Sequence, residues 1–245
     1  MSVWGDTSGD RLREPIPAVL VETADELVLV DTGCNTALLR DPPLRRRFHG
    51  DPAAVVELPG AGEPLEAALA EAGVGLSEVT AVALSHLHHD HAGGLRLLPR
   101  VPVHCQAAEL AFGLGPEAET HGVYRIDFDD PSIDWRLADG DVEIVPGLTA
   151  LATPGHTPGH QSFAVRLDPS VGGGGYLFAF DAADLTANLE QELAIGEAIG
   201  CEPSGTVGQI VRLKAMAARW SLRLVPGHDP EAWPALAAEL ATRFA

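Results

Sequence analysis

One short stretch limits what this chain can fold into more than any other part of the sequence. Within ten residues, His86, His88, Asp90 and His91 form the pattern His-x-His-x-Asp-His. Neutral imidazole and carboxylate are standard ligands of zinc and similar divalent metal ions. The apolar run Val79–Leu84 comes directly before this pattern and predicts a buried strand. The chain therefore has to hold a ligand-rich loop at the end of a rigid strand.

The spacing inside this loop divides its ligands into two pairs. In an extended segment, alternate residues point to the same side, so His86 and His88 can bind one metal ion together. Asp90 and His91 lie further on, where the chain turns toward a helix, and can bind a second ion. The local sequence thus supplies side chains that can bind two metal ions.

Three further strings follow along the chain. They are Thr-Pro-Gly-His-Thr-Pro-Gly-His at 153–160, Phe-Ala-Phe-Asp at 178–181 and Pro-Gly-His-Asp at 226–229. With the first pattern, and in this order, they resemble the metallo-β-lactamase superfamily and, more narrowly, its N-acyl-homoserine lactonases. The resemblance implies an α/β fold, the four-layer αββα sandwich. It also implies one hydrolase domain over residues 1–245.

The resemblance implies seven metal ligands, which are His86, His88, Asp90, His91, His156, Asp181 and His228. It places His156 with the first histidine pair on one ion and His228 with Asp90 and His91 on the other, and Asp181 bridges both. We expect His160 and Asp31 to support these ligands through hydrogen bonds rather than to bind metal.

The expected cofactors are two divalent metal ions, with no further cofactor site. Di-iron relatives of this fold carry Glu where His88 stands here, so zinc hydrolysis is favoured over redox chemistry. Manganese, cobalt and iron stay open as native metals, because mixed histidine and carboxylate sites accept all of them.

The resemblance implies a reaction in which a hydroxide bridging two metal ions opens the ring of an N-acyl-homoserine lactone or a related lactone. Asp90 is expected to carry a proton to the leaving alkoxide. Asp184 departs from the pattern, because the best-known lactonases have a Tyr there that hydrogen-bonds the lactone carbonyl. An ionised carboxylate cannot donate that bond. Asp184, the second expected catalytic residue, is therefore protonated by burial, or binds a cationic or hydroxyl-bearing substrate, or points away.

Other functions stay open at this point. A thioesterase of the glyoxalase II type, or another ester or phosphodiester hydrolase of the same fold, uses similar ligands. A non-catalytic protein with structural metals is the contrasting class, although structural zinc sites usually close four ligands around the ion. His89 either lines the substrate pocket or faces solvent. Cys34 has no base beside it in the sequence and is not expected to act as a nucleophile.

The resemblance implies a small-molecule lactone or ester as the partner, and composition argues against the larger alternatives. The formal net charge is −19, which argues against nucleic-acid binding because that requires a basic face. No apolar run reaches the roughly 20 residues of a membrane span. The start of the sequence shows no signal peptide, and three scattered cysteines are no disulfide framework, so we expect a cytoplasmic protein. Dimers are common among such enzymes, so a homodimer is also expected, although no segment marks an interface.

Hydrophobic periodicity predicts the following elements. We expect a hairpin at 16–23 and 26–31, helices at 63–72, 106–113, 206–220 and 233–244, and strands at 79–84, 142–152 (split by Pro146-Gly147), 162–167, 176–180 and 222–225. Ser204 is the expected N-cap of the third helix. The order of these elements fits two halves in which strands precede helices.

Overall fold

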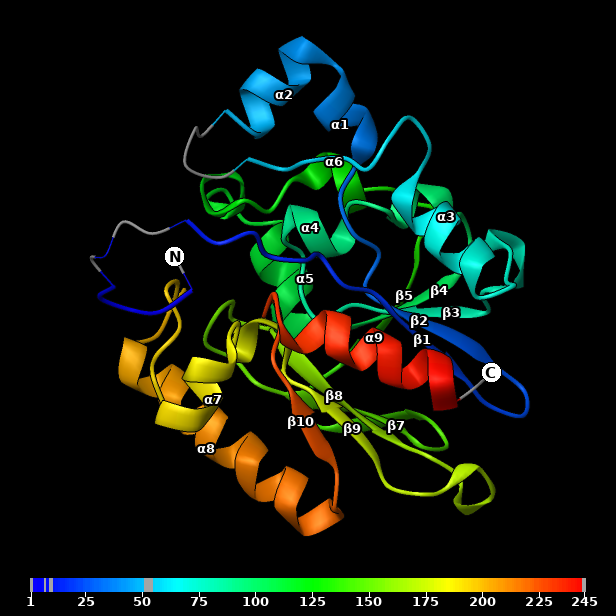
Figure 1. The fold of residues 1–245 in the computed structure, drawn as a ribbon. Helices are drawn as coiled ribbons and strands as arrows, with labels where there is room; N and C mark the ends of the chain where they lie inside the picture. The colour runs from blue at the N-terminus through cyan, green and yellow to red at the C-terminus, as the bar shows by residue number, and fades with distance from the viewer. Residues whose placement is uncertain (1, 7, 9–10, 51–54, 244–245) are drawn as a thin grey trace. The chain divides into compact units, whose positions relative to one another are not determined.

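The computed structural model describes residues 2–6, 8, 11–50 and 55–243, and the chain forms two compact units. Unit 1 comprises Met1–Pro17, Gln106–Glu109 and Ala138–Ala245, and unit 2 comprises Ala18–Cys105 and Leu110–Leu137. Two five-stranded sheets run through the chain, one largely in each unit (Figure 1). The single domain over residues 1–245 stays a prediction.

The sheet of unit 2 has the strand order β1-β2-β3-β4-β5. Its strands are β1 (Val19–Glu22), β2 (Leu27–Val30), β3 (Ala81–Ala83), β4 (Pro102–Gln106) and β5 (Asp134–Ala138). The predicted hairpin is confirmed, because β1 and β2 pair antiparallel with Val19 opposite Val30. Strands β2, β3 and β4 are parallel, and this arrangement requires crossover connections of the kind that helices usually supply.

Short helices accompany this sheet. They are α1 (Thr36–Arg40), α2 (Pro42–Phe48), α3 (Pro64–Glu71), α4 (His89–Ala92), α6 (Arg125–Phe128), and the 3-10 turns η1 (Leu76–Glu78), η2 (Leu95–Leu97) and η3 (Ala118–His121), while α5 (Ala107–Gly113) begins in unit 1. Helix α3 shows why they form. Pro64 starts it with a preset φ, and Leu65 and Leu69, four residues apart, share the face that packs with Leu29 and Val82 of the sheet.

The sheet of unit 1 has the order β10-β9-β8-β7-β6. Its strands are β6 (Val142–Val145), β7 (Leu148–Ala152), β8 (Gln161–Arg166), β9 (Gly175–Phe178) and β10 (Arg223–Val225). Strands β6 to β9 are antiparallel neighbours, and β10 is parallel to β9. The predicted break at Pro146-Gly147 is confirmed as the turn between β6 and β7, where Gly147 has φ +92°.

Two long helices pack on this sheet. They are α8 (Pro203–Trp220) and α9 (Ala232–Arg243), and the shorter η4 (Pro169–Val171), η5 (Phe180–Ala182) and α7 (Thr186–Gln191) complete the unit. Residues of α8, Ile210 and Leu213 among them, share a buried cluster with Leu177 of β9. Trp233 of α9 stacks on Phe178, which lies on the other face of β9 because neighbouring strand residues alternate.

The start of α8 differs from the prediction. The helix begins at Pro203 with Glu202 as N-cap, and Ser204 lies inside its first turn rather than at the cap. Proline at the first helical position fixes φ and needs no N–H partner, so it starts the helix three residues before the expected start at 206. No helix among the described residues is both long enough and apolar enough to span a membrane.

Candidate metal centre

The four ligands predicted in unit 2, here called the first ligand cluster, are His86, His88, Asp90 and His91. They follow β3, which ends at Ala83, and the last two lie on α4. All three histidines are buried, and the side chain of Asp90 is 22% exposed. The structure thus places the predicted loop at the end of the predicted strand.

Asp31 holds this loop from the end of strand β2. Its two carboxylate oxygens accept hydrogen bonds from the backbone N–H and the hydroxyl of Ser85, each at 2.7 Å. Its Oδ2 atom also lies 2.8 Å from Nδ1 of His91. Asp31 is fully buried and has φ +58°, an unusual backbone conformation for a residue other than glycine. Asp31 therefore fixes which ring nitrogen of His91 carries the proton.

Burial raises the pKa of Asp31, and His91 and the bonds from Ser85 oppose that effect. Thr32 also holds His91, because its backbone N–H and its side-chain hydroxyl both donate to the carbonyl of His91, at 2.7 Å each. With Nδ1 of His91 directed at Asp31, its Nε2 is the atom available to a metal ion, and it lies 3.5 Å from Oδ2 of Asp90.

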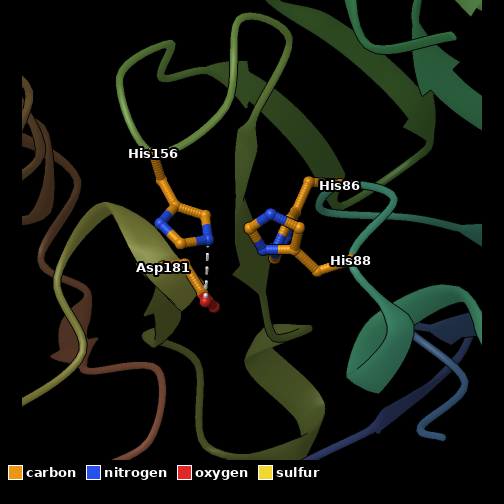
Figure 2. A group of neighbouring side chains, drawn as sticks. All are labelled: His86, His88, His156 and Asp181. Carbon is orange, nitrogen blue, oxygen red and sulfur yellow. Dashed lines mark hydrogen bonds and ion pairs between the residues drawn. The ribbon is translucent and has the colours of Figure 1, made fainter. Parts of the chain in front are cut away.

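The first two histidines of this cluster converge. Nε2 of His86 lies 2.9 Å from Nδ1 of His88, and the rings stand edge to face (Figure 2). The hydroxyl of Ser85 lies 2.9 Å from Nδ1 of His86. This leaves Nε2 of His86 as the nitrogen that approaches its partner histidine, as expected of two ligands that share an ion.

The three ligands predicted in unit 1, here called the second ligand cluster, are His156, Asp181 and His228. His156 lies in the loop between β7 and β8, Asp181 in η5 after β9, and His228 after β10. Nε2 of His156 lies 3.3 Å from Oδ2 of Asp181, as the dashed line in Figure 2 shows. Nε2 of His228 lies 3.1 Å from Oδ1 of the same carboxylate. Each oxygen of Asp181 therefore faces a different imidazole.

This cluster fits cations in its donor chemistry. Nδ1 of His228 lies 2.8 Å from the carbonyl oxygen of Pro15, and a carbonyl can only accept, so Nδ1 carries the proton. Nε2 of the neutral ring then has a lone pair, yet it faces a carboxylate oxygen of Asp181. Two acceptors at this distance are favourable when a metal ion binds both. The residues present thus fit divalent metal ions.

The backbone brings Asp181 and His228 together. Gly227 donates to the carbonyl of Ala183 and His228 donates to the carbonyl of Asp184, both at 2.8 Å. A Cβ atom at Gly227 would lie 2.6 Å from the carbonyl oxygen of Phe180, so this close approach requires glycine. Phe180 itself has φ +48°, a strained conformation for a bulky residue, directly before Asp181.

Asp184 lies beside the second ligand cluster. Its Oδ1 atom is enclosed and has no hydrogen-bond partner among the described residues. Burial raises the pKa of Asp184 well above its usual value, and the carboxylate of Asp181 raises it further. Which of the three alternatives holds for Asp184 stays a prediction.

His89 belongs to an aromatic cluster within unit 2. Its ring stacks on Tyr124 with centroids 5.4 Å apart and meets His49 edge to face at 4.6 Å. The hydroxyl of Tyr124 donates to the carbonyl of Phe48 at the end of α2. Sγ of Cys34 lies 3.9 Å from Nδ1 of His89, a contact that the sequence did not indicate. Burial and neighbouring carboxylates raise the pKa of Cys34 far above its usual value, so the expectation that this thiol is no nucleophile stays a prediction.

Sequence reasoning missed two supports of the second ligand cluster. One is the carbonyl of Pro15, which orients His228. The other is Glu109, whose carboxylate bonds the loop that carries His156. The expected support, His160, is fully buried, and its Nδ1 lies 2.9 Å from the hydroxyl of Thr153. A backbone carbonyl leaves no trace in the sequence, and Glu109 lies in an ordinary helical pattern.

Comparisons with known proteins agree with this picture. Residues 12–171 match the family model of the Metallo-beta-lactamase superfamily. The N-acyl homoserine lactonase AttM of Azorhizobium caulinodans is 32% identical over 230 residues, which cover 90% of this chain and 84% of the relative. The N-acyl homoserine lactonase AiiA of Bacillus thuringiensis subsp. kurstaki is 31% identical over 227 residues, with 92% and 85% covered.

A solved structure supports the fold directly. An N-acyl homoserine lactone hydrolase with the product N-hexanoyl-L-homoserine at its catalytic metal centre matches with a TM-score of 0.75 and 30% identity, over 91% of this chain and 85% of that one. The predicted fold class, the αββα sandwich, and the predicted class of enzyme, a metal-dependent hydrolase resembling the lactonases, are thereby confirmed. This chain belongs to the metallo-β-lactamase superfamily.

Proposed function

We propose that this protein opens the ring of an N-acyl-homoserine lactone, or of a related lactone, with water activated by two bound metal ions. The observation that carries the proposal is Asp181, whose two carboxylate oxygens each face one imidazole nitrogen. A carboxylate in this arrangement would be able to hold two ions. The substrate class is supported by the lactonases AttM and AiiA, because each is matched over more than four fifths of its length.

The proposed ligand sets divide the seven side chains between the two ions. One ion would be held by His86, His88, His156 and Asp181, and the other by Asp90, His91 and His228. Asp181 would be shared between the two ions. Each set combines imidazoles with at least one carboxylate, the donor mixture that zinc accepts. We propose zinc as the metal, with manganese, cobalt and iron as the alternatives.

Divalent ions held in this way act as Lewis acids, which activate water near neutral pH and polarise a substrate carbonyl. The protein's own residues supply the remaining steps. Asp90 is the partly exposed carboxylate among the seven ligands, so it is placed to take up a proton and return it to the leaving alkoxide. Asp184 offers an enclosed carboxyl oxygen, and its protonated form donates a hydrogen bond to the substrate carbonyl.

The test is acid release from a panel of lactones. Protein loaded with zinc, and separately with manganese, meets homoserine lactones of increasing acyl length, γ- and δ-lactones and an aromatic lactone in weak buffer with a pH indicator. We expect metal-dependent acid release that a chelator abolishes, and a product with the mass of the ring-opened hydroxy acid. Asp184→Asn, which keeps a hydrogen-bond donor, is expected to retain more activity than Asp184→Ala.

A negative panel would redirect the assignment. If both metals are bound, as shown by elemental analysis, and no lactone is opened, the lactone proposal is wrong. Thioesters of the glyoxalase II type are then the next substrates to measure, followed by phosphodiesters. The low number of basic residues, 16 against 35 acidic ones, makes phosphodiesters the weaker alternative because they require cationic groups.

We also propose that the protein acts in the cytoplasm on a small-molecule substrate and forms a homodimer. The absence of a disulfide framework supports the first part, since Cys34, Cys105 and Cys201 are all free thiols. Size-exclusion chromatography with light scattering tests the second part.

A further inference from the structure

A buried carboxylate outside the predicted ligand set lies against the loop that carries His156. Glu109 is fully buried and belongs to the four-residue segment Gln106–Glu109, which clusters with unit 1 although its neighbours in sequence belong to unit 2. A buried carboxylate is costly unless polar partners compensate for its lost hydration. The partners of Glu109 therefore indicate what the fold gains from keeping it.

Those partners lie in the His156 loop. Oε2 of Glu109 accepts from the hydroxyl of Thr157 at 2.6 Å and from the backbone N–H of Gly159 at 3.0 Å. Gln106, on the same segment, donates to the side-chain oxygen of Gln161 at 2.8 Å. The segment thus holds the loop at its turn and at its exit into β8.

Thr157 links Glu109 to the metal ligand. The carbonyl of Thr157 accepts from the backbone N–H of Gly155 at 3.0 Å, and this bond closes a tight turn with His156 at its centre. The hydroxyl of the same threonine is bound by Glu109. Fixing Thr157 from both its backbone and its side chain therefore fixes the backbone from which the His156 ring projects.

Close packing makes this contact specific. A Cβ atom at Gly159 would lie 2.1 Å from the backbone nitrogen of Glu109 and 2.6 Å from its Cα, so the second glycine of Thr-Pro-Gly-His-Thr-Pro-Gly-His is needed for the two segments to meet. Gly159 therefore has a packing role in the repeated string, separate from metal binding.

We propose that Glu109 is a positioning residue for His156, which sets the affinity of the metal ion that His156 binds. The inference rests on the proposed metal site. Hydrogen bonds that orient a ligand typically contribute about 10- to 100-fold to metal affinity. The carboxylate acts through Thr157 and Gly159 and touches neither substrate nor metal.

The experiment measures metal affinity in competition with a chelator, with zinc and with cobalt, and records the visible spectrum of the cobalt protein. Glu109→Gln keeps the volume and an acceptor oxygen but removes the negative charge that strengthens both hydrogen bonds. We expect it to weaken binding of one of the two ions by about 10- to 100-fold and to shift the cobalt bands. Thr157→Val should weaken the same ion, and Thr157→Ser, which restores the hydroxyl, should recover wild-type affinity.

Controls separate positioning from stability and from the proposed function itself. Tyr176→Phe removes another hydroxyl–carboxylate hydrogen bond of unit 1, to Glu239, and should leave metal affinity unchanged. If His156→Ala binds metal as tightly as wild type, the proposed metal site is wrong. If His156→Ala weakens binding but Glu109→Gln and Thr157→Val keep wild-type affinity and spectrum, only the role of Glu109 is wrong. Should Glu109→Gln not fold, the Thr157 pair decides.

Discussion

The two ligand clusters reach similar chemistry in opposite ways. The first ligand cluster comes from six consecutive residues after one strand, His86 to His91. The second is assembled from three loops, and Asp181 and His228 alone are 47 residues apart. A local cluster needs one strand end and a short loop, whereas a dispersed cluster needs a whole sheet to bring its members together.

The supports of the two clusters differ accordingly. In the first, one side chain, Asp31, orients both the loop and the His91 ring. In the second, the Glu109 side chain bonds the His156 loop, whereas backbone groups support His228. The carbonyl of Pro15 orients His228, and the carbonyls of Ala183 and Asp184 hold the loop before it. A side-chain support can be removed by one substitution, but a backbone support is lost only when the loop moves.

Both clusters also place a strained residue at a strand end. Asp31 and Phe180 have φ values of +58° and +48°, which cost free energy in residues other than glycine. The strain turns the chain sharply at the point where a ligand or its support must project. Its presence in both units indicates that sharp strand exits are a shared requirement of the two clusters.

The largest effect is expected where the second cluster converges. Asp181→Asn replaces a carboxylate oxygen that faces one imidazole with an amide, so we expect the loss of at least one metal ion and hydrolysis reduced to the uncatalysed background. Metal content by elemental analysis and acid release measure the two effects. Wild-type rates in this variant would exclude a two-metal mechanism.

The next prediction concerns how stability depends on pH, which differs between a buried carboxyl group of unit 2 and one of unit 1. In unit 2, burial raises the pKa of Asp127 from 3.8 to about 6. The folded protein therefore binds this proton more tightly than the unfolded chain does, and the free energy of unfolding falls as pH rises from about 4 to about 6, by about 3 kcal/mol at most. Asp127→Asn should remove this slope.

Asp229 in unit 1 gives the opposite sign. Burial opposes the shift, but backbone N–H groups, those of Thr186 and Ala232 among them, lower the pKa of Asp229 below 3.8. Its contribution to stability is present above its unfolded pKa and is lost as pH falls through the folded one. Urea unfolding of the metal-free protein at several pH values measures how the free energy of unfolding depends on pH. Between about pH 4 and pH 6, Asp127→Asn should lack the fall in stability that the wild type shows. The same slope in wild type and in that variant would contradict the assignment.

A moderate effect is expected from the side-chain support of the first cluster. Asp31→Asn removes the charge, and asparagine tolerates positive φ better than most residues, so the backbone turn is retained. We expect metal affinity to fall by about 10- to 100-fold because the His91 ring loses its orienting carboxylate. Chelator competition measures this change, and unchanged affinity would show that the two hydrogen bonds from Thr32 suffice.

The same contrast explains what the sequence could predict. The first ligand cluster could be predicted because its ligands are close together in the sequence and follow an apolar strand. The seven-ligand set required the family resemblance, since spacing alone does not bring Asp181 to His228. Most strands and long helices were predicted to within a few residues from their apolar periodicity.

Other features had no local signal. Helices α1 and α2 are short. Helix α2 begins with Pro42-Pro43 and contains three arginines, so its sequence has no apolar stripe that would predict a helix. Strands β4 and β5 are different, because Val-His-Cys-Gln at 103–106 and Asp-Trp-Arg-Leu at 134–137 do alternate apolar and polar residues, and this local signal was missed. Glu109 and the carbonyl of Pro15 acquire their roles only once distant segments meet, and those meetings are set by packing that no short pattern encodes.

The smallest effects concern the glycine that lets the Asp181 and His228 loops meet. Gly227→Ala would force a Cβ atom against the carbonyl of Phe180, so we expect it to lower the free energy of unfolding by about 1–3 kcal/mol, as overpacking does, and to weaken metal binding. Gly208, inside α8, is the matched control because a Cβ atom there would meet nothing within 4 Å. Gly208→Ala should instead raise stability by up to about 1 kcal/mol, since alanine favours helix. Thermal and urea unfolding of both variants, with metal affinity alongside, separates close approach from helix propensity. Equal effects from the two substitutions would show that the second ligand cluster does not depend on this contact.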